Sequence, residues 1–171
     1  MMLRDMQPAA VAGEFREYHI NLYGFGARKV LVTDEEVPYP DGKLIVSRTD
    51  TRGIITHCNQ SFVEMSGHSR EALIGAEHSI LRHPDMPGVA FKSLWDDIEA
   101  GRIWHGYVKN LRGDGKFYWV YATVIPNVRD GRVVGYTSVR RKPSRTKIRE
   151  SIALYQQLKA QEGSHWDGPE A

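Results

Sequence analysis

Short hydrophobic runs, separated by turn-forming residues, make up the centre of the chain. Two of these runs are joined by a turn at Asp50–Gly53, and the last three are joined at Gly113–Gly115 and at Asp130–Gly131. An Asp-Gly pair favours a β-hairpin because the tight turn needs positive φ angles. The pattern therefore predicts five strands, the last three of them antiparallel. These strands are Leu44–Val46, Ile54–His57, Ile103–Leu111, Lys116–Val128 and Val133–Arg141.

Between the second and third predicted strands the hydrophobic spacing becomes helical. Asn59 and Ser69 each stand where a side chain caps a short helix, and Gly67 and Gly75 stand where those helices end. A longer amphipathic helix is expected over Gly88–Ala100, since its apolar residues recur at i, i+3, i+4 and i+7. These residues are Phe91, Leu94, Trp95 and Ile98. The predicted fold class is α+β, a five-stranded antiparallel sheet with short helices packed on one face.

Three parts are expected along the chain. Residues 1–42 form an N-terminal extension, with a short helix around Glu14–Leu22, and the extension ends in a cluster of Pro, Asp and Gly residues. Residues 43–142 form the central domain. Residues 143–171 form a basic amphipathic helix followed by a disordered tail. The apolar stripe of that helix consists of Ile148, Ile152, Tyr155 and Leu158.

Composition narrows the class of protein. The chain has 171 residues, of which 41% are hydrophobic and 26% charged, so it is neither a disordered chain nor a disulfide scaffold. Lys and Arg number 23 against 21 acidic residues, which argues against a nucleic-acid partner. Cys58 is the single cysteine, as expected in a reducing compartment, and no apolar run is long enough to span a bilayer. A cytoplasmic protein is predicted.

The strand-like run Phe117–Ile125 is apolar on both faces. Alternate residues of a strand point to opposite sides of the sheet, so both sides of this strand should be covered. The helices cover one side. The other side requires the N-terminal extension, the C-terminal helix or a second copy of the chain. This face and the C-terminal helix are therefore a candidate surface for a partner protein or for a homodimer.

The preceding strand places Trp104, Gly106, Val108 and Asn110 on one face. A large aromatic ring, a glycine, an aliphatic residue and an amide together suit a planar ligand, because the glycine permits close approach and the amide fixes hydrogen-bonding edges. An ordinary core strand, in which the glycine is required sterically, is the alternative interpretation.

Polar residues are concentrated in the segment His78–Pro87, which two prolines keep from forming a regular helix. Arg82 and His83 are suited to holding a phosphate, and Asp85 can pair with either of them. Alternatively, these groups satisfy one another within a loop. The spacing matches no strong metal motif, and the sequence lacks the nucleophile and phosphate-binding motifs of common enzyme classes. We therefore expect no enzyme and no metal site.

The run Ile55–Gly67 resembles the strand-to-helix segment of PAS domains. A narrower similarity, to the sensory PAS domain of bacterial aerotaxis receptors, covers about Leu44–Lys142. It rests on the RHPDMP, VKN and YWV sequences and on neighbouring positions. The matching segments are Leu81–Pro87, Phe91, Trp95, Gly106–Asn110, Tyr118–Val120 and Gly135–Arg140.

This resemblance implies a sensor that binds FAD without a covalent bond and reports redox or oxygen status to a signalling protein of the chemotaxis or kinase type. The aerotaxis receptors continue into a membrane anchor and a signalling region that this sequence does not contain, so a stand-alone sensor is expected. It implies that Arg82, His83 and Asp85 are needed for cofactor binding and that Trp104 and Asn110 lie near the isoalloxazine ring. An amide such as Asn110 can rotate when reduction turns a ring nitrogen from acceptor to donor. The remaining residues expected at the site are Asn59, Trp95 and Trp119.

Other ligands remain open within the same resemblance. FMN could replace FAD, a haem could bind through His78 or His83, and a PAS domain without cofactor could serve as an interaction or dimerisation module. Light-sensing relatives use a cysteine in the loop that corresponds to His78–Asp85. This loop contains none, so covalent flavin photochemistry is not expected.

Overall fold

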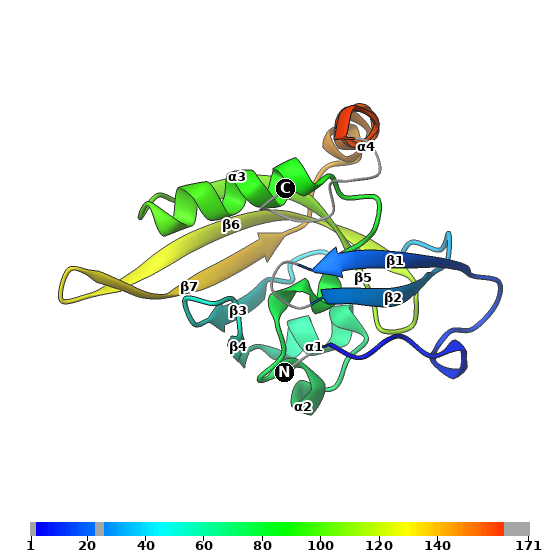
Figure 1. Ribbon diagram of the computed structural model, residues 1–171, viewed down its shortest axis with the longest axis horizontal. Coiled ribbons are helices and arrows are strands. Elements are labelled where there is room, and N and C mark those ends of the chain that lie inside the picture. Colours follow the sequence, from blue (N-terminus) through cyan, green and yellow to red (C-terminus); the bar gives the residue numbers. More distant parts are fainter. Residues whose placement is uncertain (1–2, 23–25, 163–171) are drawn as a thin grey trace.

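A five-stranded antiparallel sheet forms the centre of the protein (Figure 1). The computed structural model describes residues 3–22 and 26–162. The strand order across the sheet is β4-β3-β7-β6-β5. The hairpin of β3 and β4 therefore forms one end of the sheet, the strands β5, β6 and β7 form the other, and the pairing of β3 with β7 joins the two parts. This architecture confirms the predicted fold class. The strands are β3 (Ile45–Thr49), β4 (Ile55–Cys58), β5 (Trp104–Leu111), β6 (Phe117–Arg129) and β7 (Arg132–Arg141).

The hairpin turns form where the Asp-Gly pairs predicted them. Asp130 and Gly131, between β6 and β7, have φ angles of 51° and 76°. Gly115, between β5 and β6, has a φ of 85°. Only glycine and a few polar residues adopt such angles at low cost, and this property makes these turns recognisable in a sequence.

The helical connection between β4 and β5 also follows its predicted caps. The Asn59 side chain accepts a hydrogen bond from the Phe62 amide at the start of α1, and Ser69 accepts one from Ala72 at the start of α2. Gly67 ends α1 in the left-handed conformation, with a φ of 68°. The elements of this connection are α1 (Gln60–Ser66), α2 (Arg70–Leu73), the 3₁₀ helix η2 (His78–Leu81) and α3 (Gly88–Glu99).

The N-terminal segment differs from the prediction. After the short 3₁₀ helix η1 (Pro8–Ala10), the strands β1 (Arg16–Leu22) and β2 (Gly26–Val32) pair as an antiparallel hairpin, so the helix expected around Glu14–Leu22 is wrong. Tyr18 and Ile20 are more buried than the intervening His19, which is the two-residue period of a strand. Residues 23–25, which follow the helix expected from the sequence, lie outside the described residues.

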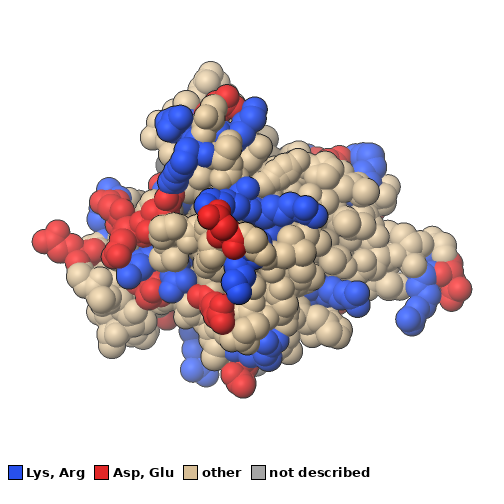
Figure 2. Space-filling model, turned by 180° about the vertical axis from the view of Figure 1, so that it is seen from behind, with Lys and Arg blue, Asp and Glu red and all other residues tan. Residues whose placement is uncertain are grey.

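The C-terminal helix α4 (Arg145–Glu162) forms as predicted and contacts α3 and β5. Of its apolar stripe, Ile148 is buried, whereas Ile152 is 39% exposed. Figure 2 shows the opposite side of the molecule, where α4 projects at the top with Lys and Arg side chains on its surface. The tail expected to be disordered, residues 163–171, lies outside the described residues. Within the described part of the chain, no helix is long and apolar enough to cross a membrane.

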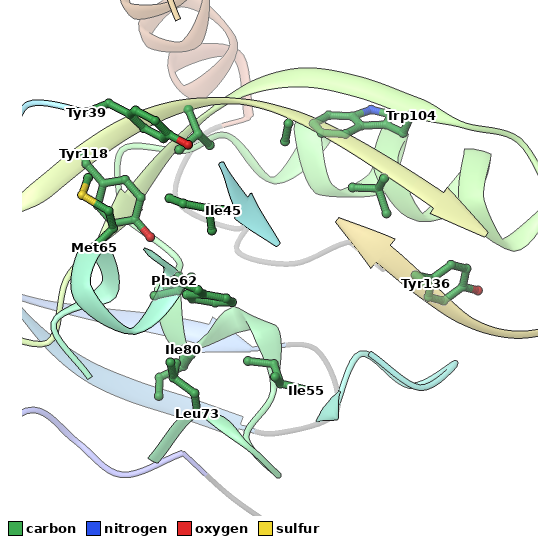
Figure 3. Close-up of a cluster of buried hydrophobic side chains, with 14 of the residues drawn as sticks. Tyr39, Ile45, Ile55, Phe62, Met65, Leu73, Ile80, Trp104, Tyr118 and Tyr136 are labelled. Carbon is green, nitrogen blue, oxygen red and sulfur yellow. The ribbon is translucent and has the colours of Figure 1, made fainter. Parts of the chain in front are cut away.

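The core is divided into two clusters. The smaller one joins Met6 and the β1–β2 hairpin to Leu111 at the end of β5. The larger one lies between the sheet and the helices, and Figure 3 shows its labelled side chains in two groups. Phe62 and Met65 lie on one side of Ile45, and Trp104 and Tyr136 lie on the other. This separation is relevant to the site because a cavity is lined by residues around Trp104 and Tyr136.

Candidate functional site

A cavity of about 610 Å³ lies between α3 and the helix-covered face of the sheet. Its size falls within the range of about 300–1,000 Å³ that is common for small-molecule and cofactor sites. The exposed residues of its lining mark the mouth; they are Thr51, Arg52, Lys92, Asp96 and Glu99. Buried residues of β5, β6 and β7 form the floor. The cavity is therefore open to solvent at one end and closed by the sheet at the other.

Small side chains along the middle of the sheet give the cavity its depth. Gly106 is opposite Ala122, and Ala122 is opposite Arg140, so these three residues form one row across β5, β6 and β7. The next row consists of Trp104, Val124 and Ser138. Residues that lie opposite one another in antiparallel strands share a face of the sheet. Ala122 and Ser138 line the cavity, and their small side chains leave space that larger ones would fill.

The Trp104 ring occupies the space beside Gly106. A Cβ atom on Gly106 would lie 2.3 Å from Trp104 Cη2, which is closer than atoms in contact can approach. This corrects the expectation that the glycine makes room for a ligand ring, since it makes room for the indole. The indole Nε1 lies 3.4 Å from Ser93 Oγ of α3, so Trp104 connects the floor to the wall.

Helix α3 forms the wall with the residues predicted for its apolar face. Phe91, Leu94, Trp95 and Ile98 all line the cavity. The Trp95 ring meets Tyr136 of β7 edge-on, with 5.8 Å between ring centroids. The amphipathic pattern that identified the helix thus also identified an apolar, partly aromatic wall.

Buried polar groups also line the cavity, and four of them come from four different segments. Glu77, Arg82, Asn110 and Arg140 are at most 7% exposed. Burial raises the pKa of Glu77, whose carboxylate accepts a hydrogen bond from the Ser79 hydroxyl at 2.7 Å. Buried polar groups are costly unless they find partners. Their convergence on one cavity is typical of a site that orients a polar ligand.

His78 lies on the same side of the cavity as Arg140. Arginine has no acceptor, so its Nη2 donates to His78 Nε2 at 2.9 Å, and the histidine proton must be on Nδ1. Burial, with a smaller contribution from the Arg140 charge, lowers the pKa of His78 to about 3. His78 is therefore neutral at physiological pH.

Four of the eight residues predicted for the site line the cavity, namely Arg82, Trp95, Trp104 and Asn110. The Arg82 guanidinium lies over the Phe91 ring, 4.8 Å from its centroid. Arg82 also forms an isolated β-bridge with Asn110. The backbone of the proline-bounded loop is thereby tied to β5, the strand that supplies the indole.

The other four predicted residues are absent from the cavity lining. Asn59 caps α1, donates to the Leu44 carbonyl and accepts from the Val46 amide, so it ties α1 to the start of β3. His83 Nδ1 accepts a hydrogen bond from the Asp85 amide. Asp85 accepts one from Lys109 Nζ at 2.8 Å. These two residues therefore brace the loop that carries Arg82.

Trp119 lies on the opposite face of the sheet from the cavity. Its ring stacks on Tyr155 of α4, with 6.2 Å between ring centroids. The Tyr155 hydroxyl donates to the Tyr107 carbonyl of β5 at 2.6 Å. The C-terminal helix thus covers part of the second apolar face of β6, one of the three coverings that the sequence left open.

Sequence reasoning did not single out Arg140, Ser138 or Glu77 as site residues. Arg140 belongs to a run of basic residues before α4 with no acidic residue between them, and such a run is typical of a solvated face. Among the described residues, no group of three His, Cys, Asp or Glu side chains is placed to hold a metal ion. Cys58 also lies outside the cavity lining.

Comparison with known proteins assigns the family. The family model described as the PAS fold matches residues 55–140. The chain belongs to the PAS-fold family. This PAS domain is 40% identical to the aerotaxis receptor of Escherichia coli (strain K12) over 129 residues, which are 75% of this chain and 26% of the receptor. The chain spans about a quarter of the length of the curated relatives it matches.

Solved PAS-type structures share the fold. The light-state structure of the blue-light photoreceptor Aureochrome1 LOV matches with a TM-score of 0.56 and 22% identity, covering 69% of this chain and 89% of that one. A light-oxygen-voltage domain studied with a flavin analogue matches with a TM-score of 0.54 and 20% identity, covering 70% of this chain and 87% of that one. At these identities the comparison establishes the fold of this PAS domain.

Buried histidines make the stability of this PAS domain sensitive to mild acid. Burial lowers the pKa of His68 to about 4 and the pKa values of His78 and His83 to about 3, against about 6.5 in an unfolded chain. The unfolded state therefore binds more protons below pH 6.5, so the free energy of unfolding falls as the pH is lowered from about 6.5 toward 5. Urea denaturation at several pH values measures this slope.

The matched control for this pH dependence is His57→Gln, since His57 is exposed. We expect the slope to be reduced in His78→Gln, where the amide can still accept from Arg140, and unchanged in His57→Gln. A wild-type free energy of unfolding that is constant between pH 6.5 and 5 contradicts the prediction.

Proposed function

We propose that this chain is a cytoplasmic redox sensor, a PAS domain that binds a flavin, FAD, and passes the redox state of the flavin to a signalling partner. The observation that carries the proposal is the cavity, with its floor of small side chains, its aromatic wall and its buried polar groups. A flat ring system with polar edges fits these features. The similarity to the aerotaxis receptor and to a domain studied with a flavin analogue supports the same ligand class.

The residues of the cavity suit distinct tasks toward a flavin. Trp104 and Trp95 provide apolar surface and exclude water from the ring. Asn110 is buried and offers both a donor and an acceptor, so its amide can follow a change in the protonation of a ligand nitrogen. Arg82 supplies positive charge for an anionic part of the ligand. The bound flavin supplies the electron-transfer chemistry, whereas these residues supply orientation and electrostatics.

The cavity favours a flavin over a haem. The haem that the sequence leaves open would be held by His78 or His83, so it needs a nitrogen of one of these rings that is free to bind iron. His78 Nε2 already accepts a hydrogen bond from Arg140, and His83 is not part of the cavity lining. The absorption spectrum of the protein distinguishes these possibilities.

The test of the proposed function is to purify the protein under native conditions and to record its visible spectrum before and after incubation with FAD or FMN. We expect flavin bands, and separation of the released cofactor by chromatography identifies FAD. A haem Soret band overturns the flavin assignment. A protein that stays colourless and binds neither flavin in titrations is a cofactor-free interaction module instead.

The helix α4 is suited to carry the signal because it closes the N-terminus of α3. The Glu162 carboxylate accepts hydrogen bonds from the Gly88 and Val89 amides, at 3.1 and 2.8 Å. The residue before α3, Pro87, provides no side-chain cap. A carboxylate at a helix N-terminus accepts hydrogen bonds from the free backbone amides and interacts favourably with the helix dipole. A shift of α3 over the cavity would therefore change the hydrogen bonds that fix the C-terminal end of α4. A partner bound to α4 would sense this change.

Substitution of this cap tests the connection. We expect Glu162→Gln to weaken the cap on α3 by about 1 kcal/mol and to lower the Tm of the protein by about 2–4 °C. Amide hydrogen exchange in the last turns of α4 should become faster. The control is Glu150→Gln, because Glu150 pairs with Lys147 on the exposed side of α4. Equal exchange in the two variants contradicts a coupling of α4 to α3.

A further inference from the structure

Arg140 is a buried cation that lines the cavity from near the C-terminal end of β7. The residue is 2% exposed and lines the cavity. Its guanidinium lies over the Phe62 ring, 4.7 Å from the centroid. Its Nη2 donates to Ser47 Oγ and to His78 Nε2, whereas Nη1 has no hydrogen-bond partner within the described chain. The protein thus holds one side of this guanidinium, whereas Nη1 is buried beside the cavity without a partner in the described chain.

No carboxylate neutralises this charge in the part of the chain that the structure describes. The groups that raise the pKa of Arg140 are the side chains of Tyr118, Tyr39 and Cys58, and no Asp or Glu is among them. Burial lowers the pKa of Arg140 to about 10, so the guanidinium is charged under physiological conditions. The buried carboxylate of the cavity, Glu77, is hydrogen-bonded to Ser79 instead.

An unpaired buried charge is costly to the folded protein. Such a cost is typical of functional sites, where a group is kept for a ligand at the expense of stability. We infer that Arg140 provides the positive charge by which the cavity favours an anionic ligand, and that it raises the midpoint potential of the bound flavin. This inference rests on the proposed function, because it specifies how that site treats the two oxidation states of its ligand.

The charge balance of the reduction gives Arg140 this effect. Oxidised flavin takes up two electrons from an external reductant, here dithionite, and one proton from water, and the ring then carries one additional negative charge. A fixed cation in an environment of low dielectric constant stabilises that charge more than bulk water with mobile counterions would. The reduced form therefore binds more tightly than the oxidised form, and tighter binding of the reduced form raises the potential.

The test is a reductive titration of the flavin-loaded protein with dithionite and a reference dye. The quantity to compare is the ratio of the affinity for reduced flavin to the affinity for oxidised flavin. We expect this ratio to be at least tenfold smaller in Arg140→Met than in wild type, which lowers the midpoint potential by at least about 30 mV for a two-electron couple. Arg140→Lys keeps a positive charge and should retain most of the wild-type potential. The control is Arg141→Met, because Arg141 is the next residue of the same strand, is exposed and faces the other side of the sheet.

Stability of the ligand-free protein separates this role from a structural one. We expect ligand-free Arg140→Met to unfold at the same urea concentration as wild type or a higher one, because a buried charge has been removed. A structural arginine would instead be destabilised by the same substitution.

Besides a loss of stability in ligand-free Arg140→Met, three results would overturn the inference. The first is flavin binding by Arg140→Met at the wild-type potential, which leaves the flavin assignment intact. The second is an equal shift in Arg141→Met. The third is a wild-type protein that binds no flavin, which overturns the proposed function as well.

Discussion

Phenylalanine in place of Ala122 is expected to prevent flavin binding while leaving the fold intact. Ala122 is 5% exposed and lies in the floor of the cavity, opposite both Gly106 and Arg140. A benzyl group at this position projects into the space that a ring-shaped ligand needs. We expect the affinity to fall at least about a hundredfold, or about 2.8 kcal/mol, as measured by titration of the purified protein with FAD.

The stability of the same variant makes the prediction specific. Filling a cavity commonly stabilises a protein by about 0.5–2 kcal/mol, so urea denaturation of ligand-free Ala122→Phe should show no loss. The control is Thr123→Phe, since Thr123 belongs to the groove on the other face, where its hydroxyl is hydrogen-bonded to His105. Wild-type affinity in Ala122→Phe would place the flavin elsewhere. If that variant unfolds, Ala122→Val asks the same question with less added volume.

Local signals in the sequence were sufficient for the elements of the central sheet. The caps at Asn59 and Ser69 and the turn at Asp130–Gly131 depend on the chemistry of one or two residues, so they can be recognised without knowing the fold. The β1–β2 hairpin could not be recognised in this way. Its strand Arg16–Leu22 does alternate Tyr18 and Ile20 with polar residues, but this run is short, and the strand is stabilised by pairing with β2 and by the distant contact of β2 with Leu111. Contacts between remote segments are absent from a local pattern.

The site was predictable to the extent that its residues lie on regular elements. The alternation along β5 placed Trp104 and Asn110 on one face, and the helical spacing of α3 included Trp95. His83 and Asp85 belong to an irregular loop, where no periodicity tells which side chains face a cavity. They face Phe117 and Lys109 instead.

Arg140 shows a different limit of the sequence. Its position next to Arg141 makes it one member of a basic run, which usually forms a solvated face. The fold places successive residues of β7 on opposite sides, so Arg140 is buried and Arg141 is exposed. Only the register of β7 with β6, in which Arg140 is opposite Ala122, shows that the buried arginine belongs to the cavity.

Alanine in place of Gly106 is expected to displace the Trp104 ring and so to reduce both stability and flavin affinity. The added Cβ would lie 2.3 Å from Cη2 and 2.5 Å from Cζ2 of the indole, and these ring atoms cannot bend away. Overpacking of this kind costs about 1–3 kcal/mol, so Tm should fall by between about 2 and 12 °C. The displaced indole must move into the cavity, which weakens flavin binding for a second reason. Thermal denaturation and FAD titration measure the two effects.

A double-mutant cycle shows whether the indole is the cause. Trp104→Leu removes the ring atoms that a Cβ at position 106 would meet, so Gly106→Ala should be nearly neutral in that background. We therefore expect a coupling energy of at least about 1 kcal/mol between the two positions. An equal cost of Gly106→Ala in both backgrounds would mean that the glycine is needed for the strand itself. With the expected coupling, the glycine is needed because it seats the tryptophan that forms one side of the cavity.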